Sequence, residues 1–146
     1  MLHRPFPSGG SHVFEKENFM RLIFMFATVT LLLASSAFAE LPSAGAALID
    51  QALASGKPTV IDLGARTCAS CKKMTPILAA LATEYQGKAN VLFVDVWEDK
   101  AAAKRFRVQM IPTQIFFDAK GKEVKRHIGF MDRADLLKEL KAAGLQ

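Results

Sequence analysis

The sequence predicts an α/β domain in which a central mixed sheet of four strands is flanked by helices. Short β-branched apolar runs alternate with longer segments whose apolar residues recur every three or four positions, a pattern typical of strands joined by amphipathic helices. Turn residues near the C-terminal end then connect the last two strands directly. The expected elements, in order, are a helix at 43–54, a strand at 59–63, a helix at 68–85, a strand at 90–96, a helix at 100–107, strands at 113–117 and 123–129, and a helix at 132–143.

The first half of the domain should contain two buried parallel strands. The helix at 43–54 ends before the turn Gly56-Lys57-Pro58, and the strand that follows is a mostly apolar run with β-branched residues. A second helix connects this strand to the one at 90–96, so the two strands are expected to be parallel with a right-handed crossover. Pro76 should bend that helix because its ring removes a backbone donor. Its apolar stripe consists of Met74, Ile77, Leu78, Leu81 and Tyr85.

The second half should end in an antiparallel hairpin. A turn at Met110-Ile111-Pro112 precedes the strand at 113–117, and the segment Asp118-Ala119-Lys120-Gly121 has the residues of a tight turn between two strands. The strand at 123–129 is therefore expected to pair antiparallel with the preceding one. In the last helix Asp132 can cap the start and Gly144 can follow the end.

Composition and charge exclude several classes of protein. The 146 residues are 51% hydrophobic and 23% charged, which is too apolar for a disordered chain and fits one domain. Two cysteines cannot form a disulfide-rich scaffold or a four-cysteine metal site. The net charge of +5 comes from scattered basic residues, so no nucleic-acid partner is predicted.

The N-terminal 39 residues are expected to be an extension and a signal peptide rather than part of the domain. Arg21 precedes an apolar run at 22–34, and small residues follow up to Ala39, the layout of a secretory signal. Cleavage after Ala39 would leave a domain of residues 40–146, and Met20 is the expected start of translation. A short membrane anchor is the alternative, but the run is short for a span and no basic cluster follows it. We therefore expect a periplasmic or otherwise exported protein without stable membrane insertion after cleavage.

The segment Cys68-Ala69-Ser70-Cys71 places two thiols where a strand turns into a helix. The spacing brings both sulfurs within bonding range across one helical turn. Cys68 lies at the helix N-terminus, where free amides and the helix dipole stabilise a thiolate, so it is the expected nucleophile. Cys71 is the expected resolving thiol of a redox-active Cys68–Cys71 disulfide. The alternatives are a zinc half-site with His127, a purely structural disulfide and an inert reduced pair.

With these motifs, the sequence resembles the thioredoxin family from about residue 43 to 144. The resemblance implies a thioredoxin fold and the activity of a thiol–disulfide oxidoreductase. The segments that carry it are Val60-Ile61-Asp62, Cys68-Ala69-Ser70-Cys71-Lys72, Pro76-Ile77-Leu78, Ile111-Pro112-Thr113 and Ile128-Gly129.

The resemblance also implies roles for individual residues. Asp62 matches the family's buried acid, which would accept and return the proton of Cys71; the alternative is a polar residue at a strand edge. Pro112 matches the family's cis-proline beside the disulfide, where the backbone of Ile111 could pair with an extended substrate; the alternative is an ordinary loop proline.

The chain departs from the family pattern around the cysteines. Thr67 replaces a tryptophan, Ala69 and Ser70 replace glycine and proline, and Gly64 replaces a second tryptophan. Phe93 lies near the position of a frequent lysine. The docking surface is therefore expected to differ from that of cytosolic thioredoxins, and its substrate-binding residues are predicted to be Thr67, Ala69, Ser70, Ile111, Pro112 and Trp97. We expect Trp97 to replace part of the missing aromatic rim; packing is the alternative role.

The preferred interpretation is a monomeric exported reductant that exchanges disulfides with protein partners. It needs no prosthetic group, because the dithiol itself carries two electrons. A thiol-transferring membrane protein would supply these electrons. Two alternatives remain: an oxidant that introduces disulfides, and a module that holds a soft ion such as Cu(I) with help from Met74 and Met110.

Overall fold

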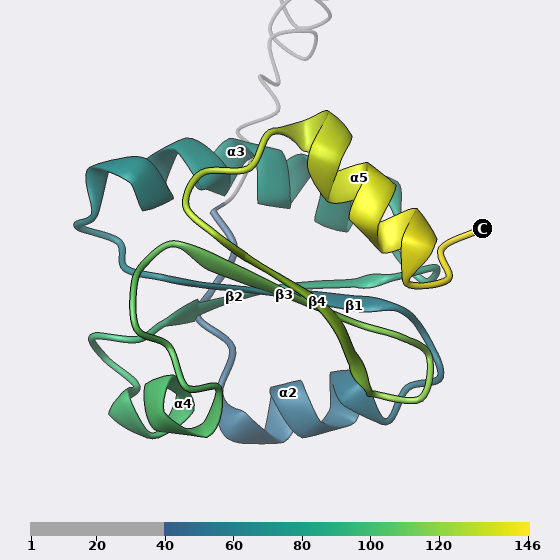
Figure 1. The fold of residues 1–146 in the computed structure, drawn as a ribbon, viewed down its shortest axis with the longest axis horizontal. Helices are drawn as coiled ribbons and strands as arrows, with labels where there is room; N and C mark the ends of the chain where they lie inside the picture. The colour runs from purple at the N-terminus through teal and green to yellow at the C-terminus, as the bar shows by residue number, and fades with distance from the viewer. Residues whose placement is uncertain (1–39) are drawn as a thin grey trace, which may run out of the picture. The chain divides into compact units, whose positions relative to one another are not determined.

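A computed structural model of the chain describes residues 40–146. The predicted signal peptide, the start at Met20 and the cleavage after Ala39 lie outside these residues and stay predictions. The described elements are α2 (Ala46–Leu53), β1 (Thr59–Gly64), α3 (Ala69–Glu84), β2 (Asn90–Asp95), α4 (Lys100–Arg105), β3 (Thr113–Phe117), β4 (Glu123–Ile128) and α5 (Arg133–Ala142) (Figure 1).

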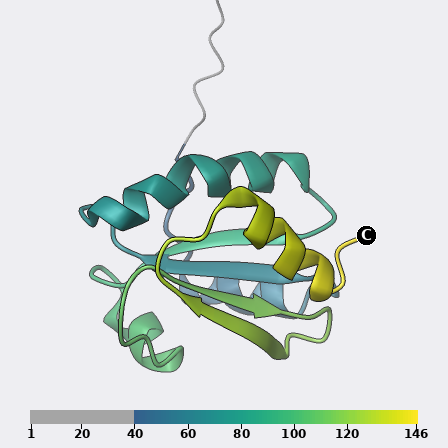
Figure 2. The ribbon, with the colours of Figure 1, turned by 45° about the horizontal axis from the view of Figure 1, so that its top comes forward.

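The four strands form one mixed sheet in the order β2-β1-β3-β4. β1 and β2 are parallel, whereas β3 is antiparallel to both β1 and β4. This confirms the predicted α/β architecture, including the parallel first strands and the C-terminal hairpin (Figure 2). Because β3 inserts beside β1, the two central strands are covered on both faces and their residues are buried throughout.

Helices cover both faces of the sheet and enclose two apolar cores. α3 and α5 lie on one face and α2 and α4 on the other (Figure 1). Alternation along β1 sends Val60 to the first core and Ile61 to the second. The first core includes Met74, Leu78, Leu81, Phe116, Leu136 and Leu140, and the second includes Ile49, Leu63, Val94, Phe106, Ile115 and Phe117.

Two helix boundaries differ from the prediction by more than one residue, each for a local reason. The first helix begins at Ala46 rather than residue 43, because Ser43 forms a bridge with Phe93 and its Oγ accepts a hydrogen bond from the Asp95 amide. The third expected helix, α4, ends at Arg105 rather than residue 107, and Arg107 has a left-handed backbone with φ 51°.

The ends of the last helix agree with the prediction. Asp132 caps the start of α5 by accepting a hydrogen bond from the Asp135 amide, and Gly144 follows its end with φ 115°.

Between residues 40 and 146, no helix combines the length and the apolar character that crossing a bilayer requires.

Candidate functional site: the two thiols at the start of α3

Both cysteines lie at the edge of the sheet where the carboxyl end of β1 leads into α3. β1 ends at Gly64, and after a short loop Cys68 takes an extended backbone conformation as the N-cap of α3. Its Sγ accepts a hydrogen bond from the Cys71 amide at 3.4 Å and lies 3.2 Å from the Ser70 Oγ. The sulfur of Cys68 thus takes the place of a capping oxygen and meets the free amides of the helix start.

The two thiols differ in exposure and in acidity. Cys68 is half-buried and Cys71 is buried. Desolvation acts to raise the pKa of Cys68, but hydrogen bonds from Cys71 and Ser70 together lower it below its ordinary value. The pKa of Cys71 is raised to about 12, mainly because the thiol is buried and secondly because it contacts the Cys68 sulfur. The arrangement therefore favours a thiolate at Cys68 and a protonated thiol at Cys71.

Gly64 allows Cys71 to pack directly against the end of β1. A Cβ atom at Gly64 would lie 3.2 Å from both Cβ and Sγ of Cys71 and 3.3 Å from the Phe93 ring. These distances are shorter than ordinary van der Waals contact, so even an alanine would press on the buried thiol. The departure from the family pattern at Gly64 thus brings the backbone of β1 close to the sulfur.

Asp62 is a buried carboxyl group on β1. Its side chain is 1% exposed, and its Oδ1 accepts a hydrogen bond of 2.7 Å from Nε2 of Gln114. Burial raises the pKa of Asp62 to about 6, although the Gln114 hydrogen bond acts to lower it. The charge of Asp62 also contributes to the raised pKa of Cys71. A carboxyl group with this pKa can gain and lose a proton near neutral pH.

Sequence reasoning missed Gln114 as a site residue. It lies on β3, where the antiparallel register sets it beside Asp62, and Phe93 is the partner of Asp62 on β2. A glutamine directly before the apolar run Ile115-Phe116-Phe117 of a buried strand was the available signal.

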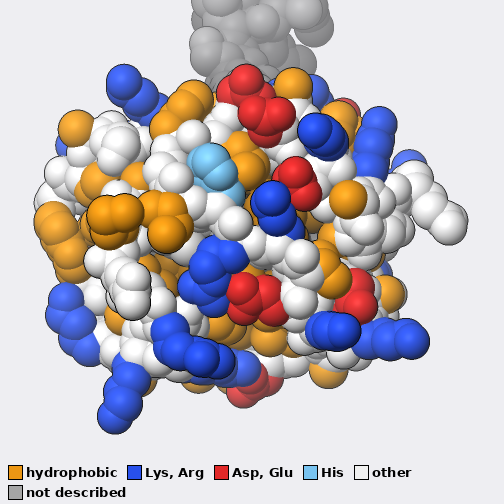
Figure 3. All heavy atoms as spheres, in the orientation of Figure 1, with side chains coloured by type: hydrophobic (Ala, Val, Ile, Leu, Met, Phe, Trp, Pro, Cys, Tyr) orange, Lys and Arg blue, Asp and Glu red, His pale blue; other side chains and the backbone are white. Residues whose placement is uncertain are grey.

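The loop before β3 lies beside the end of β4. The Ile111–Pro112 peptide bond is cis, and the Pro112 carbonyl accepts a hydrogen bond of 2.8 Å from the Gly129 amide. Pro112 is buried and Ile111 half-buried. Three exposed apolar side chains stand on or next to this loop and the paired end of β4, namely Met110, Ile128 and Phe130. In Figure 3, hydrophobic side chains gather on the side of the molecule where α3 begins.

Asp95 joins the loop that precedes Cys68 to the loop that carries Trp97. Its Oδ2 accepts from the Arg66 amide and its Oδ1 from the Trp97 amide, each at 2.9 Å. Desolvation acts to raise the pKa of Asp95, but hydrogen bonds from the amides of Arg66, Trp97 and Glu98 outweigh it, so this pKa lies below its ordinary value. Sequence reasoning did not single out Asp95 as a loop anchor.

The remaining predicted docking residues have accessible positions. The Trp97 side chain is 55% exposed. Thr67 and Ala69 are exposed, and Ser70 is half-buried.

The side chains considered for metal binding differ in exposure. The Met74 side chain is fully buried, and its sulfur accepts a hydrogen bond of 3.4 Å from the Met131 amide, whereas Met110 is 60% exposed. The His127 ring lies 3.2 Å from the Phe130 carbonyl. Within residues 40–146, no three His, Cys, Asp or Glu side chains form a group that could hold a metal ion.

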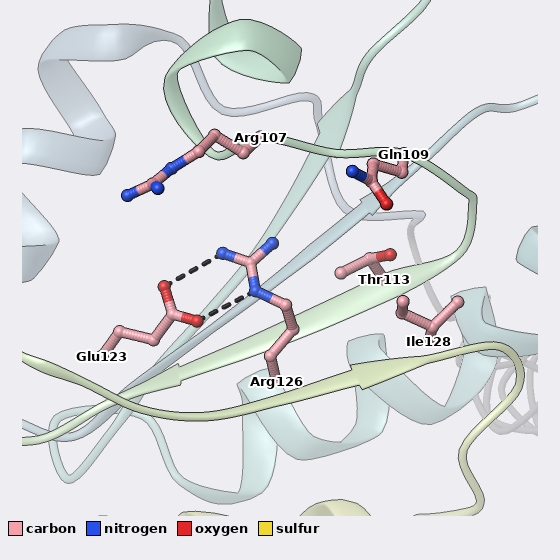
Figure 4. A pocket seen from close by; sticks show the side chains of 6 residues that line it. All are labelled: Arg107, Gln109, Thr113, Glu123, Arg126 and Ile128. Carbon is pink, nitrogen blue, oxygen red and sulfur yellow. Dashed lines mark hydrogen bonds and ion pairs between the residues drawn. The ribbon is translucent and has the colours of Figure 1, made fainter.

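A cavity of about 500 Å³ lies on β3 and β4 next to the end of α4 (Figure 4). Arg126 spans it, donating to Glu123 at 2.9 and 3.0 Å and to the Phe106 carbonyl at 2.8 Å. Its guanidinium is therefore already paired, and neither cysteine contributes to the lining. The lining residues are Arg107, Gln109, Thr113, Glu123, Arg126 and Ile128.

Known thioredoxins are similar to this domain in sequence. A thioredoxin from Staphylococcus saprophyticus is 40% identical over 77 residues, covering 53% of this chain and 73% of that protein. The bifunctional thioredoxin reductase/thioredoxin of Mycobacterium leprae is 38% identical over 88 residues, which cover 60% of this chain and 19% of that longer protein.

Solved structures of thioredoxins are similar to this domain in fold. A thioredoxin variant from Halobacterium salinarum superimposes with a TM-score of 0.64 at 25% identity, covering 77% of this chain and 97% of that chain. The thioredoxin of Fasciola hepatica gives a TM-score of 0.58 at 29% identity, covering 67% and 93% of the two chains. The sequence profile of the thioredoxin family matches residues 44–142, a segment that contains both cysteines. The chain therefore belongs to the thioredoxin family of thiol–disulfide oxidoreductases.

Proposed function

We propose that this protein is an exported reductant of disulfide bonds in other proteins. The observation that carries the proposal is the contrast between the two thiols. Cys68 is accessible and stabilised as a thiolate at the start of α3, whereas Cys71 is buried and keeps its proton next to an acid that titrates near neutral pH. This is the asymmetry that a two-step exchange requires.

In the first step the Cys68 thiolate attacks one sulfur of the partner's disulfide. A bond forms between Cys68 and that sulfur, and the partner's second sulfur leaves as a thiolate that takes a proton from solvent. The product is a mixed disulfide between the two proteins. Lowering the pKa of Cys68 increases the fraction of reactive thiolate at neutral pH.

In the second step Cys71 resolves the mixed disulfide. Asp62 accepts the Cys71 proton, and the resulting thiolate attacks the Cys68 sulfur. The Cys68–Cys71 disulfide forms, the partner's first sulfur leaves, and two electrons have passed to the partner. A pKa of about 6 at Asp62 suits this transfer, since the carboxyl group is ionised at neutral pH and still basic enough to take a proton.

The substrate is expected to bind as an extended peptide beside Ile111 and Pro112. The backbone of Ile111 would pair with the peptide, and Pro112 would keep other groups away from the sulfurs. The exposed apolar side chains of Met110, Ile128 and Phe130 support an apolar contact surface next to this loop. The other expected docking residues are Thr67, Ala69, Ser70 and Trp97.

Export is supported by the arrangement of the N-terminal sequence. Arg21, the apolar run at 22–34 and the small residues before Glu40 together have the features of a cleaved secretory signal. In an oxidising compartment the Cys68–Cys71 disulfide must be reduced after each cycle. We propose a membrane protein that transfers thiol electrons as the donor.

Replacement of the resolving cysteine tests this function directly. Cys71→Ser should leave the first step intact and stop the second, so the variant should accumulate mixed disulfides through Cys68. Expressed in cells of the source organism and analysed on non-reducing gels followed by mass spectrometry, it should carry exported, disulfide-containing partners.

Cys68→Ser is the matched control, because it removes the nucleophile and leaves the rest of the site in place. It should trap no partner. Equal recovery of partners with both variants would contradict the two-step exchange, and recovery of cytosolic partners alone would contradict the exported role.

A further inference from the structure

The environment of Gln114 is unusual for a residue in the centre of a sheet. Its side chain is fully buried in β3, between β1 and β4. Nε2 donates to Asp62, but Oε1 has no hydrogen-bond partner among the described residues, and neither does Oδ2 of Asp62. A buried acceptor without a donor destabilises a fold, and an apolar residue of similar shape would avoid this at position 114. Packing alone therefore does not explain this glutamine.

The hydrogen bond gives the two oxygens of Asp62 different surroundings. Oδ1 is held by Gln114, whereas Oδ2 is buried and free to take a proton. The neighbouring strand β2 offers Phe93 at this register position, which has no charge. From α3, the titratable group coupled to Asp62 is Cys71, which is itself in contact with Cys68. Gln114 is thus the polar side chain that fixes the orientation of the carboxyl group.

We propose that Gln114 is a positioning residue for the second exchange step, holding Oδ1 of Asp62 so that Oδ2 receives the proton of Cys71. This inference rests on the proposed function, in which Asp62 accepts that proton. The amide also stabilises the ionised carboxylate, because a hydrogen bond to a charged acceptor is stronger than one to a neutral acceptor. Loss of the amide should therefore make Asp62 harder to ionise.

The test is a Gln114→Met variant, which keeps an unbranched side chain of similar length and removes both polar atoms. Reduced protein is mixed with 5,5′-dithiobis(2-nitrobenzoate), and release of the second thionitrobenzoate reports the attack of Cys71 on the mixed disulfide. The rate is followed across pH 5 to 9, and the pKa of Asp62 is measured by carbon NMR. We expect the midpoint of the profile and the pKa of Asp62 to move upward together by about one pH unit, which corresponds to a tenfold change in the ionisation equilibrium.

Two further variants separate positioning from stability. Gln114→Leu repeats the test with a different apolar shape, in case the methionine packs badly. Ile115→Val disturbs the core on the same strand without touching Asp62, so it should lower the unfolding temperature and leave the pH midpoint unchanged.

The outcomes distinguish this inference from the function on which it rests. If folded Gln114→Met and Gln114→Leu keep the wild-type midpoint, the positioning role of Gln114 is overturned while the exchange mechanism stands. If the wild-type protein releases no second thionitrobenzoate at any pH, the proposed two-step exchange itself fails.

Discussion

The proposed role of Asp62 carries a cost in stability. The carboxyl group is buried, and its side-chain hydrogen bond comes from a neutral amide rather than a cation. Ionisation in the folded state is therefore less favourable than in the unfolded chain, which is why its pKa rises from 3.8 to about 6. The same property that lets Asp62 exchange a proton near neutral pH makes the fold less stable once the group is ionised.

This balance predicts how stability depends on pH. Between about pH 4 and pH 6 the unfolded chain has released the Asp62 proton and the folded protein still holds it, so the free energy of unfolding falls as pH rises through this window. A shift from 3.8 to about 6 corresponds to about 3 kcal/mol above pH 6. Urea unfolding of the reduced wild type and of Asp62→Asn at pH 4, 5, 6 and 7 should show the variant gaining about that much relative to the wild type. Parallel stability curves would contradict the buried, titrating carboxyl group.

The first turn of α3 is the element that activates the thiol. An extended residue before a helix leaves the first amides without backbone partners, and here the Cys68 sulfur receives the amide of Cys71. Ser70 adds its hydroxyl at 3.2 Å, at a position where the family pattern has proline. Because proline has no hydroxyl, the stabilisation of the thiolate by Ser70 belongs to this chain's own sequence.

Ser70→Ala should therefore raise the pKa of Cys68. The loss of one hydrogen bond to the thiolate should move this pKa upward, so the thiolate fraction should fall by up to about tenfold at a pH below both pKa values. The pH dependence of iodoacetamide alkylation of Cys68 in the Cys71→Ser background measures this shift. Thr83→Ala, which removes a hydroxyl bonded to the Ala79 carbonyl near the other end of the same helix, is the control and should change nothing. The same alkylation profile for Ser70→Ala and its parent would show that Ser70 does not stabilise the thiolate.

At the scale of the whole molecule, local patterns were enough to predict the order of elements and the mixed sheet. Apolar periodicity, the Asp118–Gly121 turn and the cap at Asp132 each act within a few residues, so they can be read along the chain. The Asp62–Gln114 hydrogen bond joins residues 52 positions apart and follows from the register of β1 with β3. The Asp95 contact with Arg66 likewise needs two loops to meet at one end of the sheet. Such pairs could not be predicted from local patterns, because they depend on how the strands align.

The reduction potential of the Cys68–Cys71 couple tests the central claim most directly. The purified protein is equilibrated in thiol buffers of defined potential, and the fraction of intramolecular disulfide is measured after acid quenching and alkylation. The proposed reductant should show one two-electron transition near about −270 mV. A transition near about −120 mV would instead identify an oxidant that introduces disulfides, and the absence of any Cys68–Cys71 disulfide across the range would contradict the redox function itself.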